Sequence, residues 1–239
     1  MAPIELQRPD QQPAKIARMF DAIAERYDLL NRLLSGGIDR YWRWRAIRAL
    51  GFTGRETVLD LCTGTGDVAL AALRGGARRV LGIDFAHEML RIGQRKVRGG
   101  SRPFDVGLVR GDAMVLPVSA ASVDAVTMAF GIRNVFQPAR AIAEVHRVLK
   151  PGGQLAILEF SMPRAPIVGS LYRWYFRHVL PRLGRLISRH HEAYTYLPQS
   201  VGAFFSPQEF SDLVTRAGFG CVRAVPLTFG VVYLYSARK

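Results

Sequence analysis

The stretch VLDLCTGTGDVALAALRGG, residues 58–76, decides the fold. An apolar run suited to a buried strand ends in Gly64, Thr65 and Gly66, and an alanine-rich amphipathic segment follows it. Gly64, Gly66 and Ala69 satisfy the loose pattern G-x-G-x-x-A, in which glycines let the backbone approach a nucleotide. A tight turn from strand to helix has the same composition, so the pattern is weak alone. It predicts a strand, a loop and a helix, and leaves nucleotide binding open.

Strand and helix patterns alternate from residue 58 to residue 160. This alternation predicts an α/β fold with a parallel sheet and crossover helices on both faces, and ligand sites in such folds lie on the loops. The last two expected strands, 219–227 and 230–237, are separated by too few residues for a crossover, so we expect them to be antiparallel neighbours. Between them and the alternating region, Ser206, Pro207 and Glu209 form the capping box of a helix.

Two helices are expected before this region. Apolar residues spaced by three and four over residues 14–34 predict an amphipathic helix, and Asp39 is a plausible N-cap for a second helix. Trp42 and Trp44 lie roughly 200° apart on that second helix, so both cannot point into one core. We expect a helical cap over residues 1–50 and a second domain over 51–239, with a basic and aromatic insertion at about 161–205.

Composition sets broad limits on function. The 239 residues include only two cysteines, Cys62 in the apolar strand and Cys221, which are too few for a disulfide framework or a paired-cysteine zinc site. The scarcity of cysteines favours a reducing cytoplasm, and without cysteines and histidines grouped as metal ligands we expect no metal. No signal peptide and no run of about 18 apolar residues is found, so we expect a protein that does not cross the membrane. The net charge of +14 indicates an anionic partner, which charge alone cannot identify.

Two acids suggest which nucleoside the loop holds. Asp84 ends the second expected strand about 20 residues after the glycine loop, where a carboxylate accepts hydrogen bonds from both ribose hydroxyls. NAD and S-adenosylmethionine both carry that ribose. Asp112 ends the third expected strand, where it could meet the adenine amino group or serve as an N-cap. Together with a Pro-Gly-Gly turn before the fifth strand, this set resembles the class I S-adenosylmethionine-dependent methyltransferases.

Longer motifs make the resemblance more specific. The chain is similar to the ubiquinone/menaquinone biosynthesis C-methyltransferases over nearly its whole length from Met19 onward. The motifs that carry the resemblance are FDAIAERYDLLNRLLS (20–35), LDLCTGTGD (59–67), FGIRNV (130–135), VLKPGG (148–153), LEFSMP (158–163), YFRHVLPRLGRLIS, AYTYLPQS and LTFGVVYLY.

The resemblance implies a Rossmann-like class I methyltransferase fold, with a seven-stranded, mostly parallel sheet and an antiparallel last strand. It implies S-adenosylmethionine as the cofactor, bound by Thr65 between the two loop glycines, Asp84, and Asp112 with Ala113. A further cofactor contact falls on Ala129. This position is often serine in relatives, and alanine has no hydroxyl, so only its backbone can contact the cofactor. The implied reaction is methylation of a ring carbon in a polyprenylated quinol: demethylmenaquinol, or a methoxy-polyprenyl benzoquinol in the ubiquinone branch.

Five residues are candidates for the chemistry, of which His190 and His191, shortly before AYTYLPQS, are histidines suited to proton transfer. Arg133 and Asn134 follow the fourth expected strand, and Arg133 would stabilise a quinolate or position a water that takes the proton; a structural salt bridge explains the arginine equally well. Tyr27 would cap the methionine end of the cofactor, or be an ordinary core tyrosine.

The insertion suggests a partner for the protein. Residues 161–191 mix aromatic residues with arginines and contain no acid, which favours a lid on an anionic membrane surface at the inner face of the cell membrane, although a solvated basic face fits as well. A homodimer is a further candidate assembly. The arginines concerned are Arg164, Arg173, Arg177, Arg182, Arg185 and Arg189.

Other functions are less consistent with the residues. An RNA methyltransferase would suit the charge, but neither the Asn/Asp-Pro-Pro-aromatic turn of amine methylation nor a cysteine after proline is found, so we expect no nucleic-acid partner. A nicotinamide dehydrogenase would need a substrate domain that the sequence lacks. A basic membrane scaffold without activity predicts no binding of S-adenosylmethionine.

Overall fold

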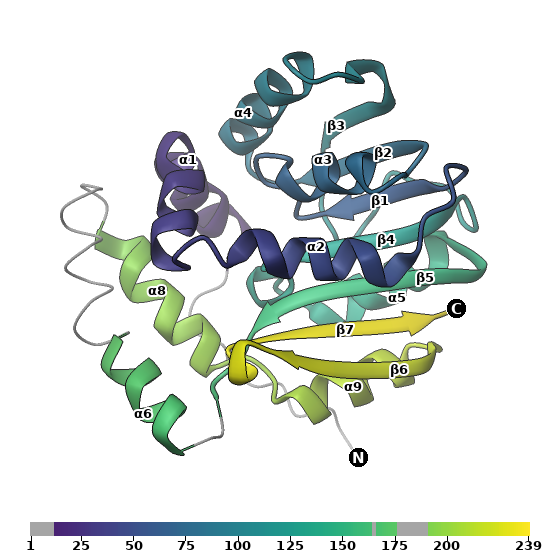
Figure 1. Ribbon diagram of the computed structural model, residues 1–239. Helices are drawn as coiled ribbons and strands as arrows, with labels where there is room; N and C mark the ends of the chain where they lie inside the picture. The colour runs from purple at the N-terminus through teal and green to yellow at the C-terminus, as the bar shows by residue number, and fades with distance from the viewer. Residues whose placement is uncertain (1–11, 164–165, 176–190) are drawn as a thin grey trace.

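The computed structural model describes residues 12–163, 166–175 and 191–239 (Figure 1). Its helices and strands follow one another in this order: α1 (Pro13–Leu34), α2 (Asp39–Leu50), β1 (Thr57–Leu61), α3 (Asp67–Arg74), β2 (Arg79–Asp84), α4 (His87–Arg98), η1 (Pro103–Asp105), β3 (Val106–Arg110), β4 (Val123–Ala129), η2 (Ile132–Asn134), α5 (Pro138–Val148), β5 (Leu149–Phe160), α6 (Pro166–Trp174), α8 (His191–Gly202), α9 (Pro207–Arg216), β6 (Gly220–Leu227), η4 (Thr228–Gly230) and β7 (Val232–Arg238).

A seven-stranded sheet in the order β3-β2-β1-β4-β5-β7-β6 forms the centre of the molecule. β1 to β5 pair in parallel, whereas β7 is antiparallel to both β5 and β6. The predicted mostly parallel sheet with an antiparallel last strand is confirmed. Because β1 lies between β2 and β4, the strand order reverses direction beside it, which is where open α/β sheets hold their ligands.

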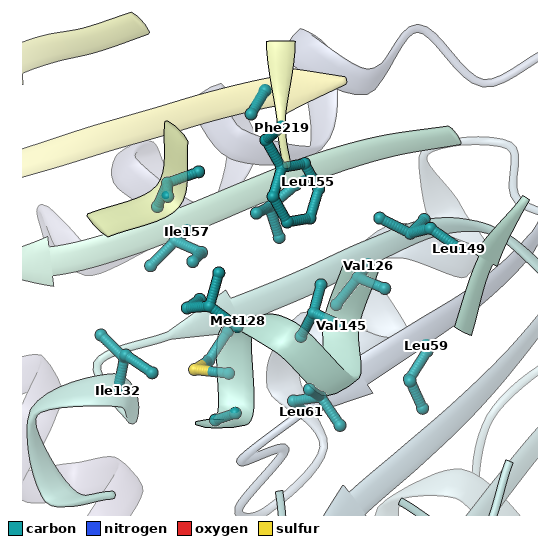
Figure 2. Packing of buried hydrophobic residues seen from close by; sticks show 14 of the residues in the cluster. Leu59, Leu61, Val126, Met128, Ile132, Val145, Leu149, Leu155, Ile157 and Phe219 are labelled. Atoms are coloured by element: carbon teal, nitrogen blue, oxygen red, sulfur yellow. The ribbon is translucent and has the colours of Figure 1, made fainter. Parts of the chain in front are cut away.

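Helices cover both faces of the sheet, as predicted. On one face α5 and α9 bury side chains such as Val145 and Phe210 against Met128 and Leu155, and Figure 2 shows part of this cluster. On the other face α2 and α3 pack on a second cluster that includes Trp42. Trp42 is 3% exposed and Trp44 is 50% exposed, so the two tryptophans point in opposite directions.

The local predictions have mixed outcomes. The capping box is confirmed, because the Ser206 hydroxyl accepts from Glu209 N and the Glu209 carboxylate accepts from Ser206 N. Asp39 is not an N-cap but the first helical residue, where its carboxylate pairs with Arg43. Asp112 lies two residues beyond β3 rather than at its end, and its carboxylate accepts from Met114 N. Cys62 follows β1 instead of lying within it.

Three helices lie beyond the carboxyl ends of the parallel strands: α1, α6 and α8 (Figure 1). None of the helices described is long and apolar enough to span a bilayer. The predicted lid falls partly outside the described residues, which omit 164–165 and 176–190. The division into a cap and a second domain remains a prediction; α2, which it assigns to the cap, packs directly on the sheet.

Candidate functional site

A buried carboxylate at the end of β1 holds the start of the glycine loop. Asp60, in β1, accepts hydrogen bonds from the hydroxyls of Thr63 (2.6 Å) and Thr127 (2.7 Å). It is 1% exposed, and burial raises its pKa to about 6, although both hydroxyl bonds oppose the rise. The loop is thus held to β1 and β4 before any ligand binds.

The loop is also tied to the end of β2. Asp84 Oδ2 accepts from Gly64 N at 2.7 Å, and Oδ1 accepts from Ala86 N at 2.8 Å. Burial raises the pKa of Asp84 against these hydrogen bonds. Gly64 and Gly66 both have positive φ, of 55° and 79°, which explains why glycine is favoured at these two positions. The carboxylate therefore stands beside a bare stretch of backbone, as a ribose site requires.

A first cavity lies between this loop and α1. Its lining includes seven of the predicted site residues, which come from α1, the glycine loop and the ends of β2, β3 and β4: Tyr27, Gly64, Asp84, Asp112, Ala113, Ala129 and Asn134. Apolar side chains of α1, among them Ile16 and Phe20, cover it from the other side. The cavity combines carboxylates at two strand ends with an apolar cover.

Thr65 and Gly66 lie beside the cavity without lining it. The Thr65 hydroxyl donates to Asp28 Oδ1 of α1 at 2.6 Å and accepts from Lys96 Nζ of α4 at 2.9 Å. Lys96 also pairs with Asp28 and with Asp67, and Asp67 in turn pairs with Arg43 of α2. The threonine hydroxyl therefore connects the loop to the surrounding helices, and any contact of this residue with a ligand would come from its backbone.

Cys62 contributes to the same cavity wall. Its backbone has a positive φ of 53°, and a Cβ on Gly131 would lie 2.3 Å from the Cys62 Cβ. Residue 131 must therefore be glycine for the two loops to pack together. Burial, with Asp84 as a further cause, holds the pKa of the thiol well above its usual value, which keeps the sulfur protonated and unreactive.

A second cavity adjoins the first. Its lining is mostly aromatic and aliphatic and comes from α1, α2, α6 and α8 together with the ends of β4 and β5. Phe130 stacks on Phe160 with ring centroids 4.5 Å apart, and Trp42 meets both rings edge-on. Such walls suit a flat aromatic ring.

Arg133 is the principal charged group at this aromatic wall. Its Nη1 donates to Glu159 Oε1 at 2.6 Å and to the Phe130 carbonyl at 2.5 Å, and its guanidinium lies 5.4 Å from the Phe160 ring centre. Glu159 is fully buried and also accepts from the backbone N–H groups of Arg133 and Phe160. Burial alone would lower the pKa of Arg133, but the charge of Glu159 outweighs it and raises the pKa, so the cation persists inside the protein.

The two interpretations of Arg133 are therefore compatible: it forms a buried salt bridge and it lines the second cavity. Asn134 lines the first cavity instead, and its Oδ1 accepts from the hydroxyl of Tyr196, which lines the second. Phe20, Tyr27 and Phe130 line both cavities. Tyr27 is accordingly a wall residue between two spaces, and burial raises its pKa.

Sequence reasoning missed several residues of the site. Glu159 lies in LEFSMP, a stretch that contains an acid inside an otherwise apolar strand, and such an acid signals a buried ion pair. Asp60 carries the same signal within VLDL. Phe20 and Phe130 gave no signal of their own, because aromatic residues at these spacings are also typical of a core.

Comparison with known proteins relates the chain to a methyltransferase family. The model of the ubiE/COQ5 methyltransferase family matches residues 8–239. A ubiquinone/menaquinone biosynthesis C-methyltransferase UbiE of Syntrophotalea carbinolica is 48% identical, covering 96% of this chain and 97% of its own. A demethylmenaquinone methyltransferase of Thermus thermophilus is 47% identical, covering 91% and 98%. Among solved structures, a SAM-dependent methyltransferase of Thermotoga maritima described as a possible histamine N-methyltransferase has a TM-score of 0.64 at 20% identity, covering 93% and 98%, and so supports the fold alone.

Proposed function

The chain belongs to the ubiE/COQ5 methyltransferase family, and from this membership we propose that it transfers the methyl group of S-adenosylmethionine to a ring carbon of a polyprenylated quinol. Demethylmenaquinol is the proposed substrate, because relatives at 44–47% identity are named demethylmenaquinone methyltransferases. The methoxy-polyprenyl benzoquinol of the ubiquinone branch is a second candidate, favoured by the relative named for both pathways. The observation that carries the proposal is the pair of adjoining cavities with shared walls.

The first cavity is the proposed cofactor site. Asp84 would accept from the ribose hydroxyls, and Asp112 with Ala113 would lie beside adenine. Asp84 accepts two backbone N–H bonds, so the fold itself orients its carboxylate. Tyr27 and Phe130 line both cavities, so a cofactor in the first and a quinol ring in the second would be neighbours.

The second cavity is the proposed quinol site. S-adenosylmethionine, held by Asp84, Asp112 and Ala113, would supply an electrophilic methyl group to the quinol ring carbon. The phenolic proton and the displaced ring proton would both pass to water, and Arg133 would position the water that takes the first. The Arg133 cation would stabilise the phenolate oxygen, and Phe130 and Phe160 would stack on the ring. Apolar walls exclude water from the reacting atoms. The membrane that holds the isoprenoid tail is the proposed site of peripheral association.

A methyl-transfer assay tests the function. Radiolabelled S-adenosylmethionine is supplied with a reduced short-chain demethylnaphthoquinol, a short-chain methoxybenzoquinol or bulk RNA. We expect label in the naphthoquinol ring and none in RNA. Labelled RNA with unlabelled quinols would replace the proposal with nucleic-acid methylation.

A single substitution tests the cofactor site. Asp84→Ala should weaken the binding of S-adenosylhomocysteine by about 1–3 kcal/mol, because the ribose hydroxyls lose a charged acceptor. Calorimetry measures the affinity, and circular dichroism checks that the fold is retained. Asp105→Ala, which removes a carboxylate at η1 away from both cavities, is the control and should bind as the wild type does. Unchanged affinity in Asp84→Ala would move the ribose contact elsewhere.

A further inference from the structure

The outer face of α2 has an unusual composition. Trp42, Ala46 and Leu50 point into the core, and the opposite side of the helix carries only apolar, aromatic and arginine residues. Tyr41 and Trp44 stack with ring centroids 6.1 Å apart. The large outward residues are Arg40, Tyr41, Trp44, Arg45 and Arg48, with Ile38 directly before the helix.

The end of α1 extends this surface. Leu29 and Leu33, one helical turn apart, are exposed beside Arg32. Each large apolar residue of the region exposes between 41% and 54% of its surface, an unfavourable arrangement if water were the only neighbour. We call the following set the α2 face: Leu29, Arg32, Leu33, Ile38, Arg40, Tyr41, Trp44, Arg45 and Arg48. In Figure 1, α2 (dark blue) crosses the front of the sheet and joins α1 at its left end.

The charges of the α2 face have one sign. The acid within its span is Asp39, which is buried and paired with Arg43. Arg45 lies 5.8 Å from the ring centre of Tyr41, and Arg48 lies 5.2 Å from that of Trp44. A surface groove between α2 and α3 is lined by Trp44, by arginines of three helices and by Asp67, whose carboxylate is paired with Arg43 and Lys96. The arginines are Arg32, Arg40, Arg43, Arg48 and Arg74. This groove suits phosphate groups.

The α2 face borders the second cavity. Leu34, Ser35 and Asp39, which line that cavity, alternate along the chain with the exposed Leu33 and Ile38. The Tyr175 hydroxyl donates to the Leu34 carbonyl at 3.0 Å, which brings the end of α6 to the same place. Leu171 and Trp174 of α6 are exposed there, next to the cavity-lining Tyr172 and Tyr175. Exposed apolar residues of α1, α2 and α6 thus lie next in sequence to residues that line the second cavity.

We propose that the α2 face docks on an anionic phospholipid membrane, with Trp44 and the exposed leucines in the interface and the arginines on lipid phosphates. Aliphatic groups favour lipid over nucleic acid, because a phosphate backbone offers them no apolar partner. The site differs from the predicted lid, since α2 precedes the sheet. One consequence rests on the proposed function: the quinol ring would enter the second cavity while its tail stays in lipid.

Co-sedimentation with vesicles tests the proposal. The wild type should bind vesicles of phosphatidylglycerol and phosphatidylcholine and bind phosphatidylcholine alone much more weakly. The triple variant Arg40→Gln, Arg45→Gln, Arg48→Gln should lose about five-fold per arginine, on the order of a hundred-fold in all. Trp44→Ala should weaken binding to both kinds of vesicle. The control Arg79→Gln, Arg216→Gln, Arg223→Gln carries the same charge change on other exposed surfaces and should lose far less than the first variant.

Three outcomes would overturn the proposal: equal losses in both triple variants, unchanged binding in the first, or RNA that binds more tightly than vesicles and is released by the same substitutions. Methyl transfer to a short-chain quinol in detergent-free buffer separates this proposal from the proposed function. Activity there with no vesicle binding would reject the membrane face alone. Vesicle binding with no transfer would reject the enzyme alone.

Discussion

At the scale of single residues, Asp60 sets a pH dependence of stability. Its folded pKa of about 6 exceeds that of an unfolded aspartate, about 3.9. The folded state therefore binds more protons between these values, so the free energy of unfolding should fall by about 3 kcal/mol as pH rises through this window, and then level off. Asp60→Asn, which stays neutral, should lack this fall. Urea unfolding between about pH 4 and pH 7 measures both profiles.

Burial also raises the pKa of Asp84, so a matched control is needed. Asp212→Asn removes an exposed aspartate of α9 that accepts from Gln208, and its profile should run parallel to that of the wild type. If the unfolding free energy of Asp60→Asn varied with pH as that of the wild type does, the pKa of Asp60 would be the same in the folded and unfolded states. Burial would then not raise it.

At the scale of elements, α1 is held on the glycine loop by Asp28. The Asp28 carboxylate accepts from the Thr65 hydroxyl and pairs with Lys96, so these contacts would hold α1 over a nucleoside bound in the proposed cofactor site. Asp28→Ala removes both contacts. We expect S-adenosylhomocysteine to dissociate roughly five- to ten-fold faster, corresponding to about 1–1.5 kcal/mol for the lost contacts. Stopped-flow displacement measures the rate.

Glu25 provides the comparison on the same helix. It pairs with Arg91 and Arg95 of α4, but all three side chains are more than half exposed, and such pairs contribute little. Glu25→Gln should therefore leave the dissociation rate close to that of the wild type. Equal acceleration in both variants would mean that general loosening of α1, and not the contact at Thr65, controls release.

The sequence predicts well those features that depend on the spacing of neighbouring residues. The alternation after residue 58, the capping box at Ser206 and the opposed tryptophans each depend on spacing within a short stretch. The site contacts do not: at the second cavity Arg133 meets Glu159 across 26 positions, and beside the first cavity Thr65 meets Asp28 across 37. Distant segments that meet in the fold leave no mark in local periodicity, so these contacts could not be predicted from one chain.

The errors have a related physical cause. Asp39 was expected to cap α2, since aspartate favours that position, but its carboxylate forms an ion pair with Arg43 instead. Cys62 was placed in the strand because it is apolar, yet the chain turns sharply there, with positive φ, so that it packs against Gly131. In both cases a tertiary contact decided between two locally acceptable arrangements.

At the scale of the whole molecule, the two cavities share walls, so their ligands should bind cooperatively. Phe20, Tyr27 and Phe130 line both, and α1 contributes to each. A nucleoside that orders these side chains reduces the conformational entropy that is lost when the quinol binds. We expect S-adenosylhomocysteine to strengthen the binding of a short-chain quinol analogue by roughly five-fold or more, and the analogue to strengthen nucleoside binding by the same factor.

Calorimetry of each ligand, with and without the other, measures this factor in both directions. Phe20→Ala removes a shared wall and should bring the factor close to one. Ile23→Ala, at a residue that lines the second cavity alone, should weaken the quinol analogue while leaving the factor unchanged. If Phe20→Ala weakened both ligands but kept the wild-type factor, the two sites would be independent, and the shared side chains would act as passive packing between them.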